Sequence, residues 1–225
     1  MTRLFAALLC ASAFGETLRY RAEWRGLEAG EAVVTWRDGD ARLELRTKGL
    51  VAKLHRVEDV YTVKLREGYC AVSSLMRADE GKRREETSIT YGAGVVSVLV
   101  RDLVRSAEVR REFPAAPCTH DVPGALRRLM SDRVEPGGAV EYQMANERKS
   151  ARVRVVALRK EPVETKVGRF DAVQYEVHML NDVLYRRKGR LLVWLSADAR
   201  RLPIRIQVRM PFPLGTVTLE LVAIS

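Results

Sequence analysis

The residues best suited to chemistry stand together in the run Cys118-Thr119-His120-Asp121. A thiolate, an imidazole and a carboxylate are all metal ligands, and a thiolate beside a histidine is also a nucleophile. A zinc site, however, needs three or four ligands that converge on one ion, and adjacent residues rarely converge unaided. A disulfide at Cys118 would also remove the nucleophile. We therefore interpret the run as a disulfide followed by a helix cap, and we predict no metal and no cofactor.

Other catalytic patterns are missing from the sequence. The only histidines are His55, His120 and His178, and none of them stands in H-x-H or H-x-x-x-H spacing. There is no G-x-S-x-G nucleophile motif. The adjacent carboxylates Glu58-Asp59 and Glu85-Glu86 would point to opposite faces of a strand, so neither pair can act as acid and base alone. The sequence therefore predicts no catalytic residue.

The N-terminus has the pattern of a secretion signal. Arg3 precedes the apolar run Leu4–Leu9, and Ala11-Ser12-Ala13 matches an A-x-A cleavage site. We predict a signal peptide over residues 1–15 and one exported, periplasmic β domain over residues 16–225. Leu9 precedes Cys10 where lipoprotein processing places a small residue, so a lipid anchor at Cys10 is not expected. No later apolar run is long enough to span a bilayer.

Cleavage would leave two cysteines, Cys70 and Cys118, in an oxidising compartment. An even number of cysteines there indicates a disulfide, and two buried free thiols are the alternative.

The charge balance is basic, with 39 Lys and Arg against 29 Asp and Glu and a formal net charge of +10. The cations are spread along the chain and no nucleic-acid-binding motif accompanies them, so nucleic acid is not an expected partner. They fit solvated strand faces, and an anionic envelope surface remains a candidate partner.

Strict alternation of apolar and charged residues dominates the chain. In residues 18–25 it places Leu18, Tyr20, Ala22 and Trp24 on one face of a strand. Such strands are half buried and antiparallel. One segment has helical spacing instead, with apolar residues at 122, 125, 126, 129 and 130 after the N-cap residue Asp121. The sequence predicts an all-β, mainly antiparallel fold: a curved sheet, open barrel or half-barrel with one short helix near 121–131.

Aromatic residues mark a candidate ligand face. Trp24 and Trp36 share the apolar register of Tyr20, and Trp194 lies in the apolar run Leu191–Leu195. A curved antiparallel sheet with apolar residues on its concave side can hold an apolar ligand. We take Tyr20, Trp24, Trp36 and Trp194 as this face, and plain core packing is the alternative.

The C-terminal part resembles a known family. The run Val193-Trp194-Leu195-Ser196 is followed by Asp198, Arg201, Pro203 and Ile204, and later by Gly215 and Glu220-Leu221. This pattern resembles the closing signature of the bacterial exported family called domain of unknown function 3108, and Trp24, Gly26 and Ala29-Gly30 resemble its opening. The resemblance implies an envelope protein with no assigned activity. The motif residues taken as structural are Gly30, Asp121, Asp198, Arg201, Pro203 and Gly215.

Three functions follow in order of preference. The first is a non-enzymatic envelope protein that holds an apolar or lipid-like ligand on the concave sheet. The second is an envelope assembly or scaffold protein that meets an anionic surface or partner through a basic outer face. The third is a hydrolase, which would need a convergent cluster of Asp, Glu and His side chains in a cleft.

Overall fold

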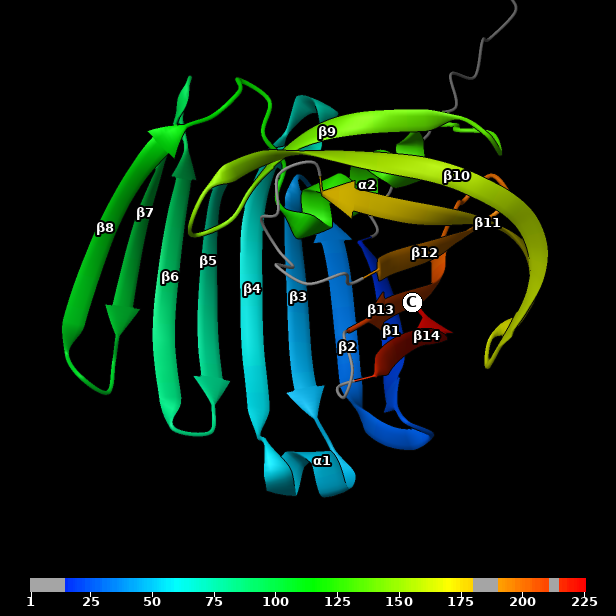
Figure 1. The fold of residues 1–225 in the computed structure, drawn as a ribbon, viewed down its shortest axis with the longest axis horizontal. Coiled ribbons are helices and arrows are strands. Elements are labelled where there is room, and N and C mark those ends of the chain that lie inside the picture. The colour runs from blue at the N-terminus through cyan, green and yellow to red at the C-terminus, as the bar shows by residue number, and fades with distance from the viewer. Residues whose placement is uncertain (1–14, 180–189, 211–214) are drawn as a thin grey trace, which may run out of the picture.

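The computed structural model describes residues 15–179, 190–210 and 215–225 (Figure 1). The signal peptide expected over residues 1–15, with Cys10, lies outside this part except for Gly15. Within the described residues, fourteen strands form a single sheet in the order β8-β7-β6-β5-β4-β3-β2-β1-β14-β13-β12-β11-β10-β9. The elements are β1 (Glu16–Trp24), β2 (Leu27–Arg37), β3 (Asp40–Thr47), α1 (Gly49–Leu54), β4 (Val57–Arg66), a 3-10 turn (Glu67–Tyr69), β5 (Cys70–Glu80), β6 (Arg83–Tyr91), β7 (Val95–Asp102), β8 (Ala107–Pro114), α2 (Val122–Ser131), β9 (Ala139–Ala145), β10 (Ser150–Thr165), β11 (Gly168–Met179), β12 (Arg190–Ser196), β13 (Pro203–Arg209) and β14 (Thr216–Ile224).

The sheet coils around α2 without closing into a barrel. Strands β1 to β8 form one wall, and β9 to β12 pass over the helix on the other side (Figure 1). Each strand pairs antiparallel with its neighbours, and β8 and β9 are the two edges. The prediction of an all-β, half-barrel-like fold with one short helix near 121–131 is confirmed. A second helix, α1, is a single short turn between β3 and β4.

The inner face of the sheet, which faces α2, follows from the strand register because directly paired residues share a face. Tyr20 pairs with Ala32 and with Leu221, and all three are buried. Arg19, the neighbour of Tyr20, is exposed on the outer face. The alternation of apolar and charged residues therefore corresponds to an inner and an outer face, and the core lies between the inner face and α2.

Helix α2 begins where its sequence predicts. The Asp121 carboxylate accepts a hydrogen bond from the Gly124 N–H at 3.0 Å, which satisfies one of the free amides of the first turn. A Cβ atom on Gly124 would lie 2.7 Å from the Tyr69 carbonyl oxygen, so a glycine is needed for this close approach to the sheet. On the next turn, the Arg127 guanidinium lies 5.5 Å from the centre of the Trp36 ring and 2.9 Å from the Glu16 carboxylate. Arg127 thus links the helix to β1 and β2.

The predicted disulfide joins Cys70 to Cys118, with Cα atoms 5.1 Å apart. Directly after it, the Thr119 carbonyl accepts the Ala71 N–H of β5 at 2.9 Å. The next residue, His120, donates its N–H to Gln143 of β9 at 2.7 Å. The segment after the disulfide therefore connects β5 to the edge strand β9 and brings the chain to the start of α2.

We expect removal of this disulfide to destabilise the fold without changing it. The bridge closes a loop with a sequence separation of 48 residues. In the chain-entropy model a loop of this size contributes about 4 kcal/mol. The double variant Cys70→Ser/Cys118→Ser should lose about this much free energy of unfolding in urea. Reductant should destabilise the wild type alone, and equal sensitivity of both proteins to reductant would contradict the prediction.

Candidate functional site

The C-terminal end of α2 is held by one arginine from a distant hairpin. The Arg201 guanidinium donates to the Met130 carbonyl at 3.1 Å, and more weakly to the Leu129 carbonyl at 3.4 Å. It also donates to the Tyr175 hydroxyl at 2.8 Å. The last carbonyls of a helix have no partner within the helix and carry partial negative charge, which a guanidinium satisfies. Arg201 therefore ties the β12–β13 hairpin to the helix.

The hairpin that presents Arg201 is shaped by Asp198. One oxygen of its carboxylate accepts the N–H groups of Arg200 and Arg201 and the Ser196 hydroxyl, at 2.8 to 3.2 Å. Two residues after Arg201, the Pro203 carbonyl accepts the buried Tyr20 hydroxyl at 2.7 Å. The C-terminal motif thus positions the helix and joins it to β1.

Two further motif residues are glycines for steric reasons. A Cβ atom on Gly30 would lie 2.2 Å from the Arg46 carbonyl oxygen, so only glycine allows β2 and β3 to approach here. Gly215, before β14, has a φ of +82°, a backbone conformation that favours glycine.

A cluster of buried polar side chains lies at the N-terminal end of α2. Asp121 is only 2% exposed, and burial raises the pKa of its carboxyl to about 6. Its Oδ2 atom has no hydrogen-bond partner among the described residues, and neither do the buried hydroxyls of Ser74 and Tyr91. Tyr61 lies close to all three side chains. The helix cap therefore holds a carboxyl group in surroundings that favour its neutral form.

An apolar cavity of about 480 Å³ lies at the end of the sheet where α1 is found. Its wall comes from β1, β2, β3, β13 and β14, and α1 and the residues next to it complete it. The main side chains are Ala22, Trp24, Leu45, Val208, Val217 and Leu219. Cavities of this size and character hold small apolar ligands or part of an acyl chain. The alternation in β1 could predict that Ala22 and Trp24 face inward. No pattern in the sequence predicts that α1 lines the same cavity.

The aromatic residues of the first hairpin share the inner face but differ in their surroundings. Trp24, the last residue of β1, is partly exposed and lines the cavity. Tyr20 and Trp36 are buried in the core, where the Tyr20 hydroxyl has a carbonyl partner and Arg127 covers the Trp36 ring. Of these three residues only Trp24 is available to a ligand.

The prediction that Trp194 belongs to the same face is wrong. Val193, directly before it, pairs with Tyr175, which bonds to Arg201 and so faces α2. Trp194 therefore points to the outer face, where its indole N–H donates to the Glu161 carboxylate at 2.7 Å. The run Leu191–Leu195 has no alternation because β12 is buried on both faces. Its sequence therefore could not reveal which residues point inward.

The reactive residues singled out by type are held in structural roles. Cys118 is oxidised in the disulfide, and the Nδ1 atom of His120 lies 2.9 Å from the Tyr69 carbonyl oxygen. The His120 ring packs edge-on against Tyr142. Among the described residues, no three His, Cys, Asp or Glu side chains are grouped closely enough to hold a metal ion.

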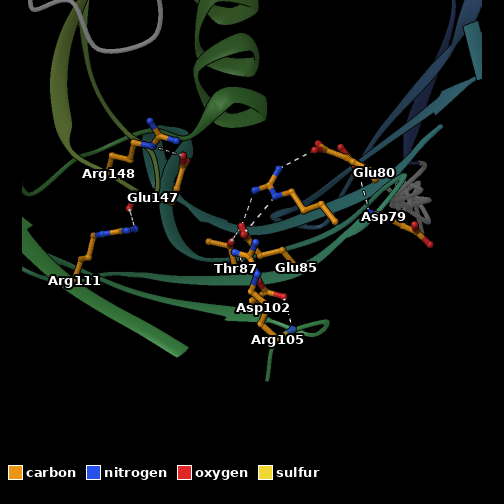
Figure 2. Close-up of polar contacts among 11 residues, drawn as sticks. Asp79, Glu80, Glu85, Thr87, Asp102, Arg105, Arg111, Glu147 and Arg148 are labelled. Carbon is orange, nitrogen blue, oxygen red and sulfur yellow. Dashed lines mark hydrogen bonds and ion pairs between the residues drawn. The ribbon is translucent and has the colours of Figure 1, made fainter. Parts of the chain in front are cut away.

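Charged residues on strands β5 to β8 pair with one another. Arg83 donates to Glu80 at 2.8 Å and to Glu85 at 2.7 Å, and the Thr87 hydroxyl lies beside Glu85 (Figure 2). Arg111 of β8 reaches the Glu147 carbonyl in the β9–β10 hairpin (Figure 2). Arg84 also lies 3.9 Å from Asp79, and Arg110 lies 3.6 Å from Glu108. Three of the four arginines in the runs at residues 82–84 and 110–111 therefore have an acidic partner.

Taken together, fold and cavity define a coiled, open antiparallel sheet around one helix, with an apolar recess at one end. The chain belongs to the family described as "Protein of unknown function (DUF3108)", whose model matches residues 19–222. The resemblance seen in the sequence is thereby confirmed. No curated protein is significantly similar to the chain. None of the described helices is long and apolar enough to cross a membrane.

Solved structures align with the chain at low sequence identity. A beta-barrel-like protein of the domain of unknown function DUF1849 from Brucella abortus aligns with a TM-score of 0.60 and 9% identity, over 95% of this chain and 98% of that chain. A DUF1089 family protein from Pseudomonas aeruginosa aligns with a TM-score of 0.44 and 14% identity, over 80% of this chain and 90% of that chain. The first of these similarities shows a shared fold.

Replacing Arg201 should destabilise the protein through the loss of the helix contacts. Charge-assisted hydrogen bonds of this kind each contribute about 1.5–3 kcal/mol, so Arg201→Ala should lower the free energy of unfolding by about 3 kcal/mol. Arg201→Lys should recover little, because an ammonium group cannot reproduce the forked geometry. The matched control is the exposed neighbour Arg200, whose replacement by alanine should cost less than about 1 kcal/mol. Equal losses in urea denaturation for the two alanine variants would refute this role of Arg201.

Asp121 should make stability fall as the pH rises from about 4 to about 6. Its carboxyl has a pKa of about 6 in the folded protein, against 3.8 for the ordinary group. In this window the folded protein keeps a proton that the unfolded chain loses, so folding becomes less favourable by up to about 3 kcal/mol. Asp121→Asn keeps a capping oxygen but cannot ionise, and should therefore flatten this slope.

The measurement is the free energy of unfolding in urea at several pH values. The variant keeps the contribution of Asp59, which has the same sign, because burial and the neighbouring Glu80 raise the pKa of Asp59 to about 6 as well. A variant whose stability depends on pH as steeply as that of the wild type would show that Asp121 ionises freely.

Proposed function

We propose that the protein is a non-enzymatic, exported envelope protein that holds an apolar, chain-like ligand in the cavity beside Trp24. The cavity carries this proposal, since it has about 480 Å³ of space behind almost wholly apolar walls. Burying apolar ligand surface is favourable at roughly 25 cal/mol per Å². The walls offer almost no polar partner, so they suit the hydrocarbon part of a ligand.

Export is part of this proposal. It is supported by the disulfide, because such bridges persist mainly in oxidising compartments. The N-terminal pattern of residues 1–15 adds the expected targeting signal.

The two alternatives receive less support. A scaffold that uses a basic outer face would need unneutralised cations there. Several outer-face arginines instead pair with carboxylates, as Arg205 does with Glu220 at 3.2 Å and Arg77 with Glu86 at 3.2 Å. A hydrolase would need a nucleophile and a base in contact, and Cys118 is held in the disulfide.

A fatty acid brominated midway along its chain tests the proposal, because bromine quenches tryptophan emission only at close range. We expect saturable quenching of the wild type. Trp24→Phe should remove most of it, since Trp24 is the tryptophan that lines the cavity, whereas Trp194→Phe on the outer face should retain it.

A blocking variant separates cavity binding from surface binding. Ala22 lines the cavity, so Ala22→Phe should fill part of it and weaken binding at least ten-fold. Ala107→Phe introduces the same ring at an exposed position of β8 and should bind as the wild type does. Absence of saturable quenching in the wild type would overturn the proposal, as would unchanged binding by a folded Ala22→Phe variant.

A further inference from the structure

Exposed apolar side chains gather at the end of the molecule where the cavity lies. Among the described residues, ten large apolar side chains are exposed, and five of them lie in or directly after the turns that follow β1, β3 and β7. These turns lie at the same end of the sheet, because neighbouring strands are antiparallel (Figure 1). The five residues are Leu27, Leu50, Leu54, Leu103 and Val104.

Helix α1 is the most exposed apolar element at this end. None of its residues is buried, and Leu50 and Leu54 are 63% and 82% exposed. Leu27, the first residue of β2 after the β1–β2 turn, is 52% exposed. Leu54 lines the cavity, Leu27 pairs with the lining residue Trp24, and Leu50 lies in the same helix as Leu54. Folding within the chain therefore does not account for their apolar character.

Positive charge accompanies these leucines. The segment from Lys48 to Arg56 contains three basic residues and no acidic residue. Lys48 pairs with Glu31 and Arg56 with Glu58 at the base of the segment. Lys53, between Leu50 and Leu54, is exposed and has no ion-pair partner among the described residues. Its ammonium group is therefore available to an anion outside the protein.

We propose that this end of the molecule docks onto an anionic phospholipid bilayer. Leu27, Leu50 and Leu54 enter the boundary between headgroups and acyl chains, and Lys53 contacts the phosphates. Amphipathic, basic helices bind bilayer surfaces in this way. The mouth of the cavity then faces the membrane, so an acyl chain can pass between them without crossing water. This last step rests on the proposed function, whereas the docking itself does not.

The mixture of side chains favours a bilayer over a protein partner. The core of a protein interface is depleted of charged residues, above all lysine. Here Lys53 lies within the leucine cluster. At a bilayer surface a lysine can lay its aliphatic stem along the apolar region while its ammonium reaches the headgroups. A lysine among exposed leucines therefore fits a bilayer surface better than the water-free core of a protein interface.

Co-sedimentation of the full chain with lipid vesicles tests the docking. We expect binding to vesicles of phosphatidylcholine with one quarter phosphatidylglycerol, weaker binding to pure phosphatidylcholine, and weakening of the anionic binding as salt is raised. Leu27→Ser/Leu50→Ser should reduce binding at least ten-fold, because two inserted side chains are lost. Lys53→Ala should reduce it about five-fold on anionic vesicles.

Matched controls lie elsewhere on the surface. Val122, at the start of α2, is 59% exposed, close to Leu50 at 63%, and Val122→Ser should bind as the wild type does. Lys166→Ala, at an exposed position in the β10–β11 turn, controls for the loss of one positive charge. Failure of the wild-type protein to bind either kind of vesicle would overturn the docking. The exposed leucines would then be assigned to contact with a protein partner. Control variants that lose as much vesicle binding as the test variants would also overturn the docking.

The test also separates docking from ligand binding. Leu27, Leu50 and Lys53 do not line the cavity, so their variants should still bind the brominated fatty acid. Ala22→Phe should still bind vesicles while failing to bind the fatty acid. Vesicle binding without fatty-acid binding would therefore refute the cavity proposal alone, and the opposite result would refute the docking alone.

Discussion

The fold depends on the fixing of one helix inside a sheet that does not close on itself. An open antiparallel sheet of this size can coil to different extents, and α2 sets how far it coils. Arg201 holds the last carbonyls of the helix, and the Asp121 carboxylate holds one of its first amides. These two residues approach the helix from opposite ends of its axis, and each also belongs to a turn or segment bound to the sheet. The helix, β5, β9 and the β12–β13 hairpin therefore form one unit.

The position of the helix explains why the interior is filled at one end and open at the other. Arg127 covers Trp36, and the Tyr20 hydroxyl is used by a carbonyl, so the inner face beside α2 is complete. Beyond the helix the same face continues through Ala22 to Trp24, where the small side chain of Ala22 lines the cavity. A single strand, β1, thus contributes to the core in its first half and to a cavity in its second half.

The sequence predicted those features that depend on local pattern. Alternation around Tyr20 showed which face turns inward, and Asp121 marked the start of the helix. The disulfide between Cys70 and Cys118 followed from the even number of cysteines and the expected oxidising compartment. Trp194 was misplaced because a strand buried on both faces has no alternation to interpret. The role of Arg201 could not be predicted, since its partners lie about seventy residues away along the chain. The cavity likewise joins β1 to β14, the first strand to the last.

The separation of the two ends bears on how the protein could bind a ligand and remain folded. The hydrogen bonds that fix α2 involve Asp121, Arg201 and Tyr20, and none of these residues lines the cavity. A ligand beside Trp24 therefore displaces no bond that the helix needs. The cavity wall nearest the solvent is α1, whose residues are all at least partly exposed and whose displacement would open no buried core. Entry of a chain at that point requires only a local change, because the rest of the sheet is held by contacts at its other end.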